Sequence, residues 1–170
     1  MEYLLNTASW SHETIRERRG EPEDGFRRYR KYLEEQRETF PPEAFKFASA
    51  DWHYDHEDHR CPHDSWVESA KIFERRTEAN RRIADGINIE ICLLGAYHDG
   101  HLYLTYFDVR SYRLSLDPDD FERKVHGDWL IDELRILENN NIVHEIDFAM
   151  RGTWIIECRD IQTNWVPIGD

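Results

Sequence analysis

From Ser65 towards the C-terminal end of the chain, apolar residues recur at every second position, and this alternation strongly favours β-strands. Successive side chains of a strand point to opposite faces, so each run presents one apolar face to a core. The clearest run alternates Ile87, Ile89, Ile91 and Leu93 with Asn88, Glu90 and Cys92. The pattern predicts strands over residues 66–75, 87–94, 101–116, 129–138, 142–149, 153–159 and 161–167.

Two segments between these runs have the composition of hairpin turns. Asp99-Gly100, within Tyr97–His101, is a leading hairpin signal. Asn139-Asn140-Asn141 lies between two runs whose apolar positions all carry even numbers: Leu130, Leu134, Ile136, Ile142, Ile146 and Phe148. The residue numbers of two cross-strand partners on this face therefore add up to an even number. This is possible only if the loop between the strands has an odd number of residues. Three asparagines, which tolerate the left-handed conformation, meet this requirement. We predict that Leu134 faces Ile146 and that Ile136 faces His144.

The first fifty residues have helical rather than strand periodicity. Ser11 can cap a short helix that ends at Arg19. A second helix is predicted from Pro22 to Phe40, and a third covers Glu43–Ala48. Because these helices are short and highly charged, we expect them to pack on the sheet.

The chain is therefore predicted to be a single α+β domain over residues 1–170. Residues 1–50 form the helical part, and residues 65–167 form a largely antiparallel sheet of six to seven strands. Neighbouring strands in sequence usually pair, so a meander is the default topology, and a partly closed barrel is the alternative.

Charge excludes some classes of function. The net charge is -13 and the pI is about 5.1, so nucleic acid and anionic membrane surfaces repel the chain on average. No run of about 18 apolar residues suggests a membrane-spanning helix. A basic protein partner fits this charge.

Cysteine usage indicates a compartment. Cys61, Cys92 and Cys158 cannot all pair with one another, and the last two lie in apolar strand patterns typical of small core residues. The segment from Met1 lacks the basic and apolar regions of a signal peptide. We therefore expect a protein of the reducing cytoplasm.

Between the two halves lies the densest group of metal-ligating side chains: His53, His56, His59, Cys61 and His63. Imidazole and thiolate groups bind zinc and related metals. The segment has neither a Cys-x-x-Cys pair nor a helical His-Glu-x-x-His motif. A solvent-exposed loop, held in place by Trp52 and Tyr54, explains the same residues without a metal.

Histidine stands beside aspartate just before three predicted strands: at His63-Asp64, at His98-Asp99 and at His126-Gly127-Asp128. Such a couple can act as an oriented base, whereas an aspartate in a turn commonly binds its own backbone. In a meander, one end of the sheet gathers the pocket candidates His63, Asp64, His98, Asp99 and His101. In the same topology, His126 and Asp128 lie at the opposite end of the sheet.

Two polar residues, Asp132 and His144, share the parity of the apolar face of their hairpin. They are either partly exposed near the edges of the sheet or buried and paired with a partner such as Arg113 or Arg135, because a buried carboxylate needs a partner. No nucleophile motif or phosphate-binding glycine loop is present in the sequence, and no catalytic residue is identified, which favours a protein that is not an enzyme.

Three segments resemble uncharacterised bacterial proteins: Cys61–Glu68, Leu94–Gly100 and His126–Leu130. A His-Asp pair that opens the first strand of a small antiparallel sheet is similar to some immunity proteins of bacterial polymorphic toxin systems. The resemblance covers roughly residues 61–167 and implies a small acidic protein that inhibits a partner by binding it. The alternative expectation is a metal-binding protein, or a metal-dependent enzyme, that uses the cluster at residues 53–63.

Overall fold

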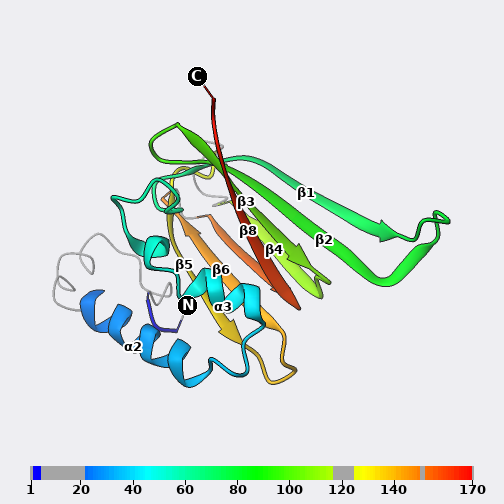
Figure 1. Cartoon of the computed structure of the whole chain (residues 1–170), viewed down its shortest axis with the longest axis horizontal. Helices are drawn as coiled ribbons and strands as arrows, with labels where there is room; N and C mark the ends of the chain where they lie inside the picture. The colour runs from blue at the N-terminus through cyan, green and yellow to red at the C-terminus, as the bar shows by residue number, and fades with distance from the viewer. Residues whose placement is uncertain (1, 5–21, 117–124, 150–151, 170) are drawn as a thin grey trace.

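The computed structural model describes residues 2–4, 22–116, 125–149 and 152–169. The described strands form two antiparallel sheets of four strands each (Figure 1). Sheet A has the order β1-β2-β3-β8 and contains β1 (Trp66–Arg76), β2 (Arg82–Leu94), β3 (Gly100–Phe107) and β8 (Asp160–Pro167). Sheet B has the order β4-β7-β6-β5 and contains β4 (Ser111–Ser115), β5 (Trp129–Ile136), β6 (Ile142–Phe148) and β7 (Thr153–Cys158). The fold is thus α+β and antiparallel as predicted, but the prediction of one sheet of six to seven strands is wrong.

The single sheet becomes two because the predicted long strand 101–116 is interrupted at Asp108. This residue has a φ of 50°, in the left-handed region that extended strands do not use. The Asp108 carboxylate accepts hydrogen bonds from Arg75 (3.1 Å) and from Arg159 (2.8 Å). The chain therefore leaves sheet A at Phe107 and enters sheet B at Ser111.

The core is one cluster shared by the two sheets and the helical part of the chain, and its strand positions follow the predicted alternation. Sheet A contributes Ile89, Ile91, Leu93, Leu102, Leu104, Tyr106 and Ile161, all buried. Sheet B contributes Trp129, Leu134, Ile142, Ile146, Phe148, Trp154, Ile156 and Cys158. In β5, the predicted core position Leu130 is wrong, since a bulge between Trp129 and Ile131 leaves Leu130 half-buried and turns Trp129 inward.

The hairpin of β5 and β6 has the predicted parity but not the predicted partners. Leu134 pairs with His144, and both predicted pairs are wrong by two residues. The Leu137 N–H donates to the Asn141 carbonyl (2.8 Å), so the loop is residues 138–140. Asn140, with a φ of 62°, takes the left-handed position at its third residue.

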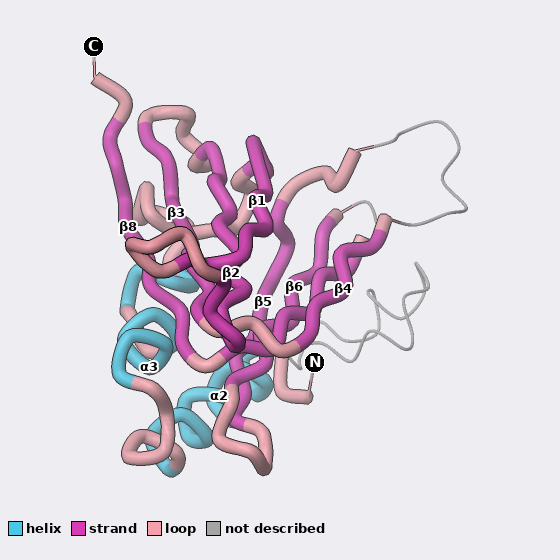
Figure 2. The backbone as a smooth tube through the Cα atoms, turned by 90° about the vertical axis from the view of Figure 1, so that its right-hand side faces the viewer, coloured by secondary structure: helices cyan, strands magenta, loops and turns pink. Residues whose placement is uncertain are grey.

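The helices cover one side of the two sheets (Figure 2). They are α2 (Pro22–Glu35), α3 (Pro42–Ala48) and the 3-10 helix η2 (Asp51–Tyr54). The predicted second helix ends at Glu35 rather than Phe40, and the helix predicted from Ser11 to Arg19 lies outside the described residues. No helix in the described ranges is long and apolar enough to cross a bilayer.

Tyrosine hydroxyl groups satisfy the free backbone edge of β5. Tyr29 donates to the Leu134 carbonyl and accepts from the Leu134 N–H, each at 2.9 Å. Tyr32 accepts from the Ile136 N–H (2.8 Å). An edge strand is a template for unwanted pairing, so α2 both packs on sheet B and blocks its edge.

The outer face of sheet B carries two buried carboxylates. Glu133 accepts hydrogen bonds from the backbone N–H groups of residues 2–4 at 2.8–2.9 Å. Asp147 accepts one hydrogen bond from the Thr153 hydroxyl, and its other oxygen has no partner among the described residues. Burial therefore raises the pKa of Asp147 to about 6.

Candidate functional site

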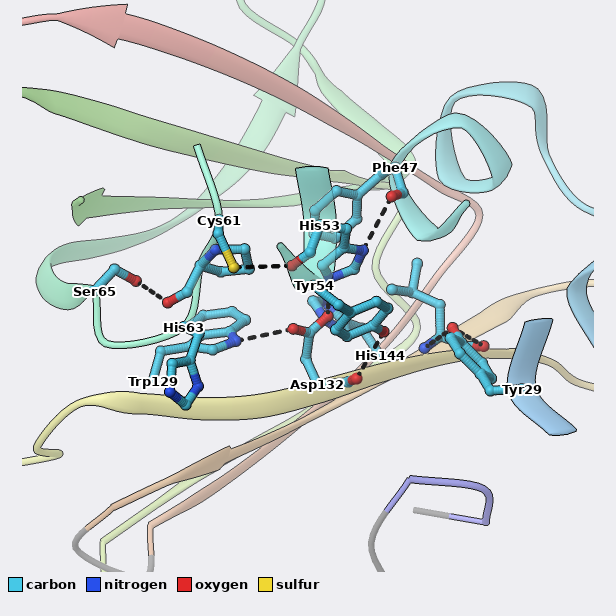
Figure 3. Close-up of polar contacts among 12 residues, drawn as sticks. Tyr29, Phe47, His53, Tyr54, Cys61, His63, Ser65, Trp129, Asp132 and His144 are labelled. Atoms are coloured by element: carbon cyan, nitrogen blue, oxygen red, sulfur yellow. Dashed lines mark hydrogen bonds and ion pairs between the residues drawn. The ribbon is translucent and has the colours of Figure 1, made fainter. Parts of the chain in front are cut away.

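A chain of polar side chains crosses the core beneath α3 and η2 (Figure 3). At its centre, Asp132 Oδ2 lies 2.9 Å from His53 Nε2 and 2.8 Å from His144 Nε2. Its Oδ1 accepts a hydrogen bond from the Trp129 indole (2.9 Å). The Tyr106 hydroxyl lies 2.8 Å from Nδ1 of His144. All five side chains are buried.

The hydrogen-bond partners determine where the protons lie. His53 Nδ1 faces the Phe47 carbonyl (3.0 Å), which only accepts, so this nitrogen donates; an ionised Asp132 also only accepts, so His53 Nε2 then donates to it. Burial would raise the pKa of Asp132, but the charge on His53 and the hydrogen bonds from both histidines outweigh it and lower that pKa. The Tyr106 hydroxyl can donate to His144 Nδ1, while His144 Nε2 donates to Asp132. The network is therefore an internally neutral ion pair.

This network is a structural element. Exposure of Asp132 and His53 is 1%, and that of His144 is 0%, so no substrate can contact them in this conformation. The prediction that Asp132 and His144 are core-facing is confirmed, but they bind each other and His53 rather than Arg113 or Arg135. Sequence reasoning missed His53 as the partner because 79 positions separate it from Asp132.

The five residues of the predicted metal cluster separate into different environments. His53 lies in the core, and the Cys61 thiol donates to the His53 carbonyl (3.2 Å). Burial raises the pKa of Cys61 to about 11. His59 is exposed and lies against Asp99, whereas the rings of His56 and His63 lie 4.3 Å apart between centroids and are tilted by 55°. Within the described residues, these five side chains do not form a group of converging ligand atoms.

Outside the core, the loop after η2 meets the β2–β3 turn and forms an exposed surface at one end of the sheets. We call it the histidine–aspartate surface; it comprises His56, His59, His63, Asp64, Trp66, Tyr97, His98, Asp99 and Asp128. His59 Nδ1 lies 2.5 Å from Asp99 Oδ2, and the His59 ring stacks on Tyr97 with centroids 4.2 Å apart. The Trp66 and His98 rings lie 4.6 Å apart.

Backbone hydrogen bonds hold this surface to the start of β5. The Asp64 N–H donates to the Trp129 carbonyl, and the Trp129 N–H donates to the Ser65 carbonyl, both at 2.9 Å. His63 Nδ1 donates to the Leu130 carbonyl (2.7 Å). Asp64 has a φ of 61°, which turns the chain sharply into β1.

Of the five predicted pocket candidates, four lie on the histidine–aspartate surface and one, His101, does not. His63 and Asp64 lie 3.3 Å apart, and His98 and Asp99 are on the facing turn. His101 instead points to the outer face of sheet A, where its Nε2 lies 2.9 Å from Glu68. Asp128 was predicted at the opposite end, but it accepts a 2.7 Å hydrogen bond from the Trp66 indole. That prediction is wrong because a single meander does not describe two sheets.

Sequence reasoning also missed a group of three residues that could bind a metal ion, Glu68, Cys92 and His101. Cys92 was predicted to lie in the core, but it is on the outer face of sheet A beside Glu68 and His101. Their ligand atoms all lie within 4.8 Å of one another. Because one residue comes from each of three strands, no local spacing motif could reveal the group.

No family model, curated protein or solved structure matches this chain.

Proposed function

We propose that the protein is a binding module for a basic protein partner, and that it acts as an inhibitor in the manner of immunity proteins. The observation that carries the proposal is a pair of half-exposed aromatic side chains set among carboxylates on the histidine–aspartate surface. Trp66 is 48% exposed and Tyr97 is 51% exposed.

Both aromatic side chains are held in place before a partner arrives. The Trp66 indole donates to Asp128, and the Tyr97 hydroxyl donates to the His56 carbonyl (3.0 Å). Tryptophan and tyrosine are enriched among residues that dominate binding energy. Little side-chain entropy remains to be lost when such fixed rings are covered, which favours affinity.

Charge indicates the chemistry of the partner. Asp64, Asp99 and Asp128 belong to this surface, and the whole chain carries a net charge of -13. A lysine or arginine of the partner can contact a carboxylate and an aromatic face together. Long-range attraction then speeds association and makes it sensitive to salt. The same charge opposes binding of nucleic acid.

A cytoplasmic location belongs to this proposal. Cys61, Cys92 and Cys158 are all free and buried, as suits a reducing compartment.

The test is capture from a host lysate with three purified proteins: wild type, the double variant Trp66→Ala/Tyr97→Ala, and Tyr112→Ala. Tyr112 is the matched control, because it is 47% exposed on β4 and lies outside the histidine–aspartate surface. We expect wild type and the control to retain the same basic protein, and the double variant to lose it. The recovered partner is then titrated against all three proteins at low and high salt.

Circular dichroism and thermal melts establish that each variant is folded. Retention of the same partner by the folded double variant, or binding that does not weaken with salt, contradicts the proposal. In the alternative of a metal site at residues 53–63, His53 and Cys61 are committed to the core, which leaves His56, His59 and His63 as the candidate ligands.

A further inference from the structure

The outer face of sheet A holds a carboxylate, a thiol and an imidazole close together. Glu68 Oε2 lies 2.9 Å from His101 Nε2 and 3.9 Å from Cys92 Sγ. The three ligand atoms all lie within 4.8 Å of one another. In the described part of the chain, this is the one set of three such groups that converges.

Strand register explains how three distant residues meet. Cys92 on β2 pairs with Tyr103 on β3, and Leu94 pairs with His101. Cys92 and His101 are therefore diagonal neighbours on one face of sheet A. The strands β1, β2 and β3 lie side by side (Figure 1).

A β-bulge brings the third residue to the same place. β1 pairs Val67 with Leu93 and then Ser69 with Cys92, so Glu68 is the extra residue. Bulges commonly redirect a side chain beside a functional site. Here the bulge places Glu68 against both Cys92 and His101.

We infer that Glu68, Cys92 and His101 form a binding site for one Zn²⁺ ion, with a fourth coordination position open to solvent or to another ligand. Zinc prefers tetrahedral sites made of sulfur, nitrogen and carboxylate oxygen. Three protein ligands with an open position are the arrangement of zinc sites that bind further molecules.

The geometry fits with small adjustments. Zinc–ligand bonds of about 2.0–2.3 Å in a tetrahedron place neighbouring ligand atoms about 3.4–3.6 Å apart. The distances from Glu68 Oε2, 2.9 Å and 3.9 Å, bracket this range. The Glu68 side chain is 46% exposed and can move, whereas the strands hold Cys92 and His101 in place.

Surrounding residues complete the site. Tyr103 is the cross-strand partner of Cys92, so its side chain lies beside the sulfur on the same face of sheet A. Lys71 of β1 lies near Cys92 but is paired with Glu90 at 2.9 Å. This site is separate from the histidine–aspartate surface, so the inference does not depend on the proposed partner.

The test uses the full chain, treated with a chelator and then titrated with ZnCl₂ and CoCl₂. We expect one ion per chain, and a thiolate-to-Co²⁺ charge-transfer band in the absorption spectrum. Cys92→Ser should abolish the band, and Glu68→Gln should weaken zinc binding by at least about tenfold. His59→Gln is the matched control, because it removes an exposed histidine elsewhere and should change neither.

Glu68→Gln keeps the comparison valid if Cys92→Ser fails to fold, because residue 68 is largely exposed. The inference is overturned if the wild type binds no zinc, or if folded Cys92→Ser retains the band. It is also overturned if Glu68→Gln binds zinc as tightly as wild type, or if His59→Gln weakens binding to the same extent.

Discussion

Replacement of Asp132 tests whether the buried network is an ion pair that stabilises the fold. In Asp132→Ala, the N–H donors of Trp129, His53 and His144 lose their acceptor, and the His53 cation loses its counterion. Removing one partner of a buried ion pair costs about 3–5 kcal/mol. Domains have a free energy of unfolding of about 5–15 kcal/mol, so we expect Asp132→Ala to lose much of its stability.

Asp132→Asn should behave differently. An amide NH₂ in place of Oδ2 can donate to Nε2 of both histidines if each ring moves its proton to Nδ1. His53 Nδ1 then still donates to the Phe47 carbonyl, and His144 Nδ1 donates to the Tyr106 oxygen. Each contact keeps one donor and one acceptor, but the buried Tyr106 hydroxyl proton loses its acceptor and the imidazolium proton is lost, so we expect a cost of about 1–3 kcal/mol.

The assays are urea denaturation at pH 7 of wild type, the two Asp132 variants and Tyr106→Phe, and ¹⁵N NMR of the imidazole rings. The spectra should show His53 protonated at both nitrogens in wild type and only at Nδ1 in Asp132→Asn. Tyr106→Phe is the matched control, because it removes a single hydrogen bond to His144 and should cost about 0.5–1.5 kcal/mol. The reasoning is refuted if Asp132→Ala loses less free energy of unfolding than Tyr106→Phe does. It is also refuted if His53 is neutral in the wild type.

Three further outcomes follow from the packing. Tyr29→Phe leaves the buried N–H and carbonyl of Leu134 without their partner, which should cost about 1–3 kcal/mol and speed hydrogen exchange at the Leu134 amide. Asp147 has a raised pKa of about 6, so the folded state binds its proton more tightly than the unfolded state, and stability falls as pH rises from about 4 to about 6. Asp147→Asn should therefore be more stable than wild type by about 1–3 kcal/mol at pH 8 but equally stable at pH 4; an equal difference in the urea midpoint at both pH values contradicts this. An added methyl group at Gly100 would overlap the Trp165 indole, so Gly100→Ala should cost about 1–3 kcal/mol, and in a double-mutant cycle this cost should largely vanish in a Trp165→Leu background.

The local part of the fold could be read from the sequence. Alternation in Ile87–Leu93 predicted a strand, and β2 confirms it, because side-chain parity in an extended chain does not depend on distant residues. The same parity correctly placed Asp132 and His144 on the core side of their hairpin.

Other features depended on residues far apart in the sequence. The division into two sheets occurs at Asp108, whose carboxylate is held by Arg75 of β1 and by Arg159, which lies between β7 and β8. The partner of Asp132 is His53, and the exposed surface beside Trp66 includes Asp128 rather than His101. No local pattern contains such contacts.

Parity and chain direction are properties of neighbouring residues, so the sequence alone determined most strands, the inner faces of β2, β6 and β7, and the odd-numbered loop between β5 and β6. Distant segments compete for the same hydrogen bonds and the same core space. The outcome of this competition sets the strand register, the bulge at Glu68 and the assignment of strands to the two sheets. Only the tertiary structure decided those, and with them which histidines are buried, which are exposed, and which one meets Cys92.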